Sequence, residues 1–143
     1  MSSEKIKHLE FIQIVITRMN TNSFQIKRLS IVIASALLAI YVSTKDNYFF
    51  LVAVFPTLIF CFLDAYYLNQ ARKFRGLYND VAGVTDEPKD IEPFAMRPDL
   101  YVGGTYSYWS AFFSITILMM YLSVMVVFLG IFSYFEFFID KLG

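Results

Sequence analysis

Residues 48–68 read YFFLVAVFPTLIFCFLDAYYL, and Asp64 is the one formally charged side chain among these apolar and aromatic residues. The hydrocarbon core of a bilayer is about 30 Å thick, and a helix of about 20 mostly apolar residues crosses it. The length and composition of this stretch therefore predict a helix that spans a membrane.

Two further stretches have the same character. Residues 29–44 (LSIVIASALLAIYVST) are short for a span, but a helix that begins near Asn20 would be long enough, which gives an expected span of 24–44. Residues 108–138 (YWSAFFSITILMMYLSVMVVFLGIFSYFEFF) exceed the length that a bilayer requires. One long helix with protruding ends is expected there, and two short re-entrant helices broken at Gly130 are the alternative.

The bulk composition agrees with a membrane protein. Hydrophobic residues make up 57% of the 143 residues, above the roughly 45–50% that is usual in globular domains. The formal net charge is zero, so no nucleic-acid partner is expected. A chain of this size is expected to form a single membrane domain, with the lipid bilayer as its main partner.

Residues 4–19 (EKIKHLEFIQIVITRM) repeat apolar side chains at steps of three and four, which predicts an amphipathic helix. Its apolar face would pack on the protein's own helices or a neighbouring subunit, or lie in the lipid headgroup plane. The polar residues 20–23 offer helix caps and predict a break before the first span.

The remaining segments connect these helices. The loop 45–47 is so short that the first two spans must form an antiparallel hairpin. The second helix is expected to continue past Leu68 to Val81, and three prolines in 82–105 then break any long helix. Residues 69–107 therefore form a helical extension followed by a loop, which is the segment expected to receive a cytoplasmic protein or signal.

The basic residues predict the orientation in the membrane. Ten lie on one side if three helices span: Lys5, Lys7, Arg18, Lys27, Arg28, Arg72, Lys73, Arg75, Lys89 and Arg97. Lys45 and Lys141 lie on the other side. We therefore expect a cytoplasmic N-terminus, a cytoplasmic segment 69–107, and a C-terminus outside.

Asp64 is the main candidate for a functional side chain, because a carboxylate inside an apolar span is costly unless it has a partner. The hairpin brings Asp64 near Lys27 and Arg28, and Arg72 lies two turns further along the same helix. The pattern fits a structural ion pair, and it also fits a carboxylate that lines a pore or binds an ion.

Small residues recur at four-residue steps in two places. Ser35, Ala39 and Ser43 share one side of the first span, and Ser110 with Ser114 does so at the start of the third stretch. Such faces let membrane helices approach closely. They are expected to pack inside one subunit or between the subunits of a homo-oligomer.

The sequence offers little for catalysis. His8 is the only histidine and is expected to be solvated, so no Ser-His-Asp or Cys-His set can be assembled. The sequence lacks the His and Cys clusters that bind metal ions, and the acidic residues of 86–99 fit a solvated loop. We therefore expect no enzyme activity, no metal and no cofactor.

Two segments are similar to segments of known families: 18–24 (RMNTNSF), before an Ala/Ser/Leu-rich span, and 63–68 (LDAYYL), before the charged run 72–78. Over residues 8–80 the chain resembles small bacterial membrane proteins of anti-phage and signalling loci. These include SLATT-type two-helix effectors, the RipA family of octameric membrane proteins, and small membrane proteins that accompany RNA-targeting CRISPR systems. The resemblance implies an oligomer that opens or leaks when infection is sensed.

Together these features predict an all-α polytopic protein of the bacterial inner membrane. The expected function is that of an oligomeric pore-forming or membrane-perturbing effector, with a place in anti-phage defence implied by the resemblance. The alternative is a non-conducting anchor or scaffold that recruits a cytoplasmic partner.

Overall fold

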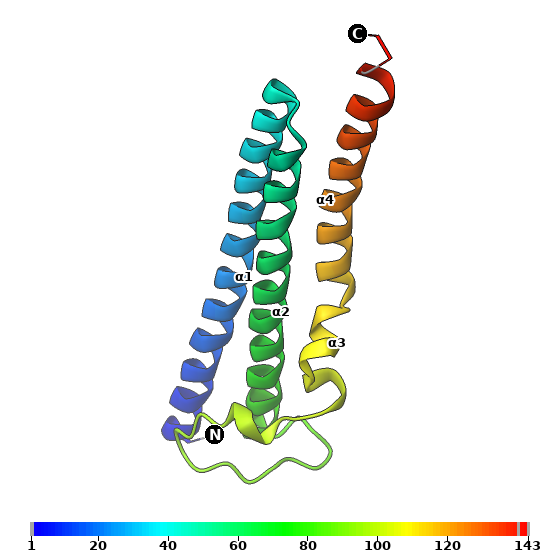
Figure 1. The fold of residues 1–143 in the computed structure, drawn as a ribbon. Helices are drawn as coiled ribbons and strands as arrows, with labels where there is room; N and C mark the ends of the chain where they lie inside the picture. Colours follow the sequence, from blue (N-terminus) through cyan, green and yellow to red (C-terminus); the bar gives the residue numbers. More distant parts are fainter. Residues whose placement is uncertain (1, 140, 143) are drawn as a thin grey trace. The chain divides into compact units, whose positions relative to one another are not determined.

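The computed structural model describes residues 2–139 and 141–142, and within that part of the chain the regular structure is entirely helical (Figure 1). The long helices are α1 (Ser3–Thr44), α2 (Asn47–Ala82) and α4 (Ile115–Tyr134). Helix α4 continues as a π-helix over Phe135–Ile139. Three described helices, α1, α2 and the stretch Ile115–Ile139, are long and apolar enough to cross a membrane. The prediction of an all-α chain with three candidate membrane spans is therefore confirmed.

The described residues group into two compact units. The loop unit contains the residues up to Phe24 together with Ala65–Ala111, and the membrane unit contains Gln25–Asp64 together with the residues from Phe112 on. The loop unit also holds two short 3-10 turns, Pro98–Leu100 and Gly104–Tyr106. Each unit is described by itself below.

Helix α1 is continuous, so the predicted break at residues 20–23 is wrong. Asparagine, threonine and serine favour helix caps but are tolerated inside a helix when their side chains find other partners. Asn20 does so, because its Oδ1 accepts a hydrogen bond from Arg75 Nη2 at 3.4 Å. The segment 4–19 is consequently the first part of a 42-residue helix rather than a separate amphipathic one.

The hairpin between α1 and α2 has the expected short connection. Only Lys45 and Asp46 separate the two helices, and Lys45 takes a positive φ of 57° at the turn. Asp46 Oδ1 accepts the backbone N–H of Tyr48 at 3.0 Å, which caps the start of α2. Helix α2 then runs without interruption to Ala82, as its periodicity predicts.

The third apolar stretch is not one helix. A short α3 (Tyr108–Phe112) ends before Phe113 and Ser114, and α4 begins at Ile115. Both expectations for this stretch are therefore wrong: the break lies at 113–114, and Gly130 lies inside α4. Ser114 has an extended backbone (φ −65°, ψ 150°), the conformation of a residue that precedes a helix. The 20 residues of α4 match the thickness of a bilayer core better than the full stretch does.

Each unit has its own apolar core. In the loop unit, Ile12 and Ile16 of α1 pack with Phe74 and Leu77 of α2 and with Tyr101 of the loop. The apolar side of residues 4–19 thus packs on the chain itself, one of the two outcomes that its pattern allows.

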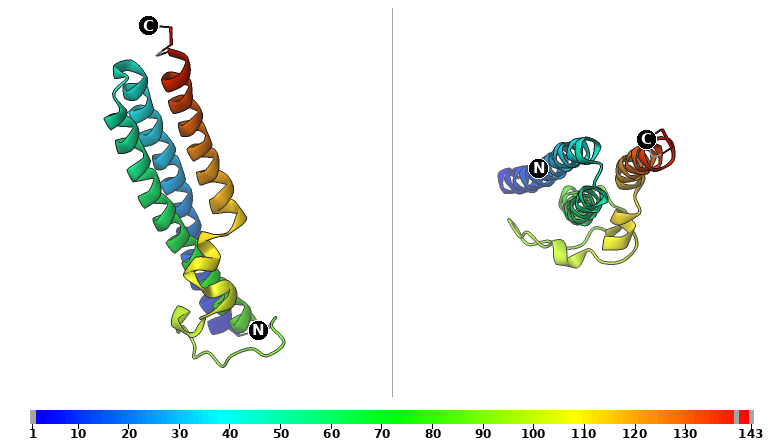
Figure 2. Two further views of the ribbon diagram at one scale, coloured as in Figure 1. Left: turned by 45° about the vertical axis from the view of Figure 1, so that its right-hand side comes forward. Right: turned by 45° about the horizontal axis from the view of Figure 1, so that its top comes forward.

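The membrane-unit core contains Ala34, Leu38 and Tyr41 of α1, Ala53 of α2 and Phe128 of α4. Figure 2 shows the second half of α1, the first half of α2 and α4 running alongside one another in this unit. Aromatic rings fill one end of it, where the Phe50 and Phe132 ring centroids lie 4.7 Å apart.

Candidate functional site

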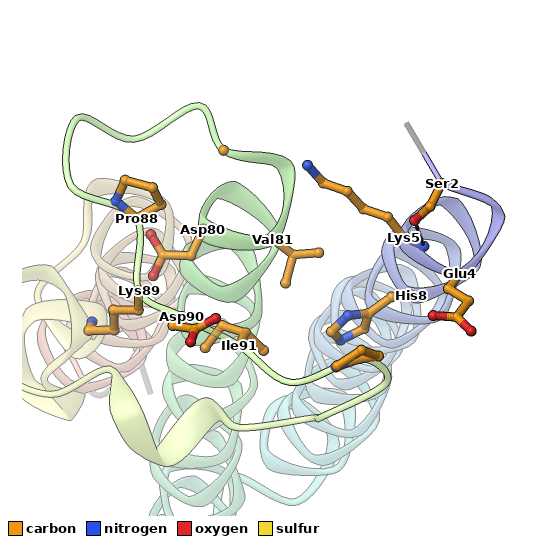
Figure 3. Close-up of a pocket in the computed structure, with 12 residues that line it drawn as sticks. Ser2, Glu4, Lys5, His8, Asp80, Val81, Pro88, Lys89, Asp90 and Ile91 are labelled. Atoms are coloured by element: carbon orange, nitrogen blue, oxygen red, sulfur yellow. Dashed lines mark hydrogen bonds between the residues drawn. The ribbon is translucent and has the colours of Figure 1, made fainter.

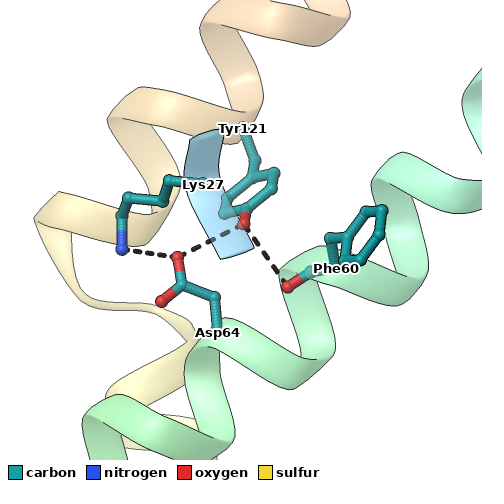
Figure 4. Close-up of polar contacts among 4 residues, drawn as sticks. All are labelled: Lys27, Phe60, Asp64 and Tyr121. Carbon is teal, nitrogen blue, oxygen red and sulfur yellow. Dashed lines mark hydrogen bonds and ion pairs between the residues drawn. The ribbon is translucent and has the colours of Figure 1, made fainter. Parts of the chain in front are cut away.

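A buried ion pair lies in the membrane unit. Asp64 on α2 has no exposed surface, and its Oδ2 lies 2.5 Å from Lys27 Nζ on α1 (Figure 4). The Lys27 side chain keeps 19% of its surface exposed. Two charges taken out of water together cost less than either one alone, because their mutual attraction offsets part of the desolvation.

Tyr121 of α4 completes this cluster. Its hydroxyl lies 3.3 Å from Asp64 Oδ2 and 3.3 Å from the Phe60 carbonyl oxygen, and either oxygen can accept the hydrogen bond that the hydroxyl donates. Tyr121 is 5% exposed, so this contact lies inside the unit. The ion-pair cluster (Lys27, Asp64 and Tyr121) therefore joins the three membrane helices through polar side chains. Sequence reasoning missed Tyr121, because the sequence does not show which hydroxyl-bearing residue of the third apolar stretch faces Asp64.

The other basic candidates do not make this pair. Arg28 follows Lys27 directly, and successive helix residues point about 100° apart, so only one of the two can face α2. Lys27 takes that place, and Arg28 is exposed. Arg72, in the loop unit, donates from Nη1 to the Thr105 carbonyl oxygen and to Ser110 Oγ, each at 3.3 Å.

The small residues singled out from the sequence lie in different surroundings. Ser35, Ala39 and Ser43 are all exposed, and the side of α1 that packs inside the unit carries Ala34 and Leu38 instead. The structure therefore does not show these three residues packed closely against another helix of the same chain. Ser110 accepts the hydrogen bond from Arg72, and Ser114 Oγ is buried without a hydrogen-bond partner before α4.

The exposed sides of the membrane helices differ in kind. The exposed side of α2 carries large side chains, with Leu51 and Phe55 about two-thirds exposed. One strip of the exposed side of α1 is what we call the small-polar face, namely Arg28, Ser35, Ala39 and Ser43, with Val32 among them. At 100° per residue these positions fall within one sector of the helix. The rest of the exposed side of this segment carries the large apolar residues Leu29, Ile31, Ile40 and Val42.

A groove borders the small-polar face. It has a volume of about 260 Å³ and lies between α1 and α4 in the membrane unit. Ser35 of α1 and Ser123 of α4 contribute its hydroxyl groups, and apolar side chains line the rest: Ile31, Ala34, Leu38, Val124, Val127 and Phe128.

The loop unit ties its long loop to α1 through His8. The histidine is 3% exposed, and its Nε2 lies 2.8 Å from the Ala95 carbonyl oxygen, so Nε2 carries the donated proton. Phe94, with a positive φ of 64°, lies 6.1 Å from the His8 ring and 5.9 Å from the Phe11 ring by centroid distance. The expectation of a solvated His8 is wrong, because a single sequence does not show that this loop folds over it.

A pocket of the loop unit lies beside His8 (Figure 3). It measures about 480 Å³, within the range of small-molecule sites, and charged side chains of both signs line it. The charged and histidine residues at its wall are Glu4, Lys5, His8, Asp80, Lys89 and Asp90.

Tyr101 anchors the loop through Asp80 and Lys89, two residues that line this pocket. It is 2% exposed, its hydroxyl donates to Asp80 Oδ2 at 2.5 Å, and Lys89 Nζ lies 4.2 Å from the centre of its ring. Burial raises the pKa of Tyr101 well above its usual value, and the hydrogen bond to the Asp80 carboxylate raises that pKa further. The neutral phenol is therefore part of the folded loop unit.

The described residues hold no group of three or more His, Cys, Asp and Glu side chains placed to bind a metal ion. The acidic residues of the loop, from Asp86 to Asp99, are exposed there. Arg97 forms a bidentate pair with Asp99, at 2.9 and 3.0 Å, which lowers the pKa of the Asp99 carboxyl.

Comparison of the chain with protein-family models, curated proteins and solved structures gives no match. The resemblance to small bacterial effector proteins therefore stays a prediction from the sequence.

Proposed function

We propose that this chain is the subunit of a homo-oligomeric membrane protein that permeabilises or perturbs the bilayer. The observation that carries the proposal is the contrast between the exposed sides of α1 and α2. The exposed side of α2 is bulky and apolar, whereas α1 carries a narrow strip of small and polar side chains between Arg28 and Ser43. Large apolar side chains of α1 are exposed on both sides of this strip: Leu29, Ile31, Ile40 and Val42.

Bulky apolar side chains suit contact with lipid tails. Small residues let two membrane helices approach closely, and serine hydroxyls form hydrogen bonds between helices or face water. An exposed arginine within reach of a span is costly against lipid and is usual where a helix faces protein or a water-filled cavity. The small-polar face is therefore better suited to a neighbouring copy, or to a path between copies, than to hydrocarbon.

The path in this proposal forms between subunits. Asp64 and Tyr121 are buried in the membrane unit and engaged with Lys27 and the backbone, so the ion-pair cluster serves to hold the three helices together. The face that remains for a path is the outer one of α1. We place the oligomer in a bacterial inner membrane, with the N-terminus in the cytoplasm and the C-terminus outside, as an effector of anti-phage defence.

Cross-linking tests which face meets a second copy. In a Cys61→Ser background, Ala39→Cys is expected to form a disulfide-linked dimer under mild oxidation in liposomes. Phe55→Cys on the exposed side of α2 is the matched control, because it is also an exposed position within a span. Equal cross-linking at both positions would contradict the assignment of the face.

Flux measurements test the activity. Wild-type protein in liposomes is expected to release a trapped small ion, and Ala39→Leu is expected to reduce that release about tenfold by filling the small-residue contact. Leu51→Trp adds a similar volume on the lipid side and is expected to leave the release unchanged. A monomeric wild-type protein that releases nothing would remove the proposal.

The pocket beside His8 favours a second candidate function, that of a membrane anchor that binds a cytoplasmic partner or ligand through the loop unit. This candidate predicts one stoichiometric soluble partner and no change in permeability. Substitutions on the small-polar face would then leave partner binding intact, which separates the two functions.

A further inference from the structure

We propose that the path between copies prefers small anions, which a ring of Arg28 side chains selects at one of its mouths. This inference rests on the proposed function, because the ring exists only where several copies bring their α1 faces together. It adds the class of permeant species, which the fold of one chain does not state.

The charges along the membrane part of α1 carry the argument. Between Gln25 and Thr44 the sequence holds two charged residues, Lys27 and Arg28, and no acidic residue. Lys27 turns inward, where Asp64 compensates its charge at 2.5 Å. Arg28 turns outward and is exposed, so the charge that this half of α1 presents to its surroundings is positive.

The acidic residues described in the membrane unit do not offset this charge. Asp64 has no exposed surface. Asp46 lies at the opposite end of the hairpin, directly after Lys45. Glu136 lines a pocket of about 300 Å³ that also contains Lys45. The electrostatic potential at the Arg28 end of the small-polar face is therefore that of an uncompensated cation.

The surroundings of Arg28 fit a pore mouth. A recess of about 230 Å³ on α1 is lined by Gln25, Arg28, Leu29 and Val32. Val32 is 63% exposed, and beyond it on the same face come the small and hydroxyl-bearing residues. Repeated around an axis, this order gives a polar and basic ring, then an apolar constriction, then a lumen of small side chains. Rings of arginine or lysine are a known device of anion-selective pores, and apolar constrictions gate by excluding water.

The test is the reversal potential of the reconstituted protein in a planar bilayer with a KCl gradient. Chloride is expected to permeate at least about fivefold more readily than potassium, because a ring of fixed positive charge concentrates anions and repels cations. Arg28→Gln should bring this ratio close to one, and Arg28→Lys should retain most of the preference. Arg97→Gln removes one positive charge from an exposed position of the loop unit and is expected to leave the ratio unchanged.

The outcomes separate the inference from the function on which it rests. A conductance that favours potassium, or an unchanged chloride preference in Arg28→Gln, overturns the role of Arg28 and leaves the pore in place. The absence of any conductance from wild-type oligomers overturns the proposed function and this inference with it. Size-exclusion profiles of the Arg28 variants, compared with wild type, show whether a lost preference comes from a lost oligomer.

Discussion

The membrane unit and the loop unit are held together by different kinds of interaction. In the membrane unit, the ion-pair cluster joins three helices at buried positions, and the surrounding helices expose large apolar side chains. In the loop unit, an apolar core containing Tyr101 holds a long loop, and the polar contacts around it are mostly partly exposed.

The difference follows from the solvent that each unit is built for. Hydrocarbon cannot hydrogen-bond, so a charge within a span must find its partner inside the protein. Water solvates any exposed polar group of the loop unit, so a lost contact there is partly replaced. We therefore expect changes to the ion pair to have larger effects than changes to single loop contacts.

The chain carries one natural probe for each unit. Trp109 is the only tryptophan and belongs to the loop unit, whereas Cys61 is the only cysteine and belongs to the membrane unit. Trp109 fluorescence and the rate of Cys61 alkylation thus follow the two units separately, and both readouts need no engineered label.

The largest effect is expected for Lys27→Met. The substitution leaves the Asp64 carboxylate buried without its counter-charge, which costs about 3–5 kcal/mol of stability. Asp64→Asn should cost less, because the Lys27 side chain is 19% exposed and can extend toward water. The rate of Cys61 alkylation in detergent measures the loss of stability in both variants.

The double variant Lys27→Met with Asp64→Leu is the control for that comparison. It removes both charges and should recover most of the loss, since apolar replacements of a buried pair are often neutral. If Lys27→Met alone alkylates Cys61 as slowly as wild type, the ion pair is not a principal contact of the membrane unit.

Gly76→Ala is expected to have the next largest effect, this time in the loop unit. A methyl group at Gly76 would lie 2.7 Å from Tyr106 Oη and 2.8 Å from Tyr101 Cδ1, so both rings must move. Overpacking of this kind costs about 1–3 kcal/mol. The shift should appear in thermal unfolding followed by Trp109 fluorescence and leave Cys61 alkylation largely unchanged.

Gly130→Ala is the matched control, because nothing lies within 4 Å of a methyl group added at Gly130 in α4. Each variant is read with the probe of its own unit, Trp109 for Gly76→Ala and Cys61 for Gly130→Ala. Helix propensity favours alanine at both positions, so equal losses would show that detergent effects, rather than the ring contacts of Gly76, set the result.

Tyr101→Phe removes the hydroxyl that donates to Asp80 and is expected to cost about 1 kcal/mol at neutral pH. The cost is limited because Asp80 is partly exposed and keeps the hydrogen bond from Thr85 Oγ1. The pKa of Tyr101 is higher in the folded protein than in an unfolded chain, where it is about 10. The contribution of its hydroxyl to stability is therefore fully present below pH 10. That contribution is lost as the pH rises above 10, at up to about 1.4 kcal/mol per pH unit.

Wild-type protein should therefore lose stability in the loop unit above pH 10 more steeply than Tyr101→Phe does. Trp109 fluorescence in chemical unfolding series between pH 9 and 11.5 measures both slopes. Parallel slopes for the two proteins would mean that the Tyr101 hydroxyl does not govern the alkaline transition.

Tyr121→Phe is expected to give the smallest effect, about 0.6 kcal/mol, which is typical of a single hydrogen bond between membrane helices. The Asp64 charge keeps its Lys27 partner in this variant, so the loss is limited to the hydroxyl contact. A loss as large as that of Lys27→Met would mean that Tyr121, rather than the ion pair, holds α4 in the membrane unit.

The amino-acid sequence alone determined the helical class, the three apolar helices, the short hairpin connection and the need of the Asp64 carboxylate for a partner inside an apolar span. These properties follow from local composition and from the length that a bilayer demands. Only the tertiary structure decided that Lys27 rather than Arg28 faces Asp64, that Tyr121 joins them, and that Ser35, Ala39 and Ser43 face outward. The rotation of each helix about its axis selects these contacts, and that rotation depends on how the helices pack against one another. For the same reason the continuity of α1, the break before α4 and the burial of His8 depend on long-range contacts that neighbouring residues do not reveal.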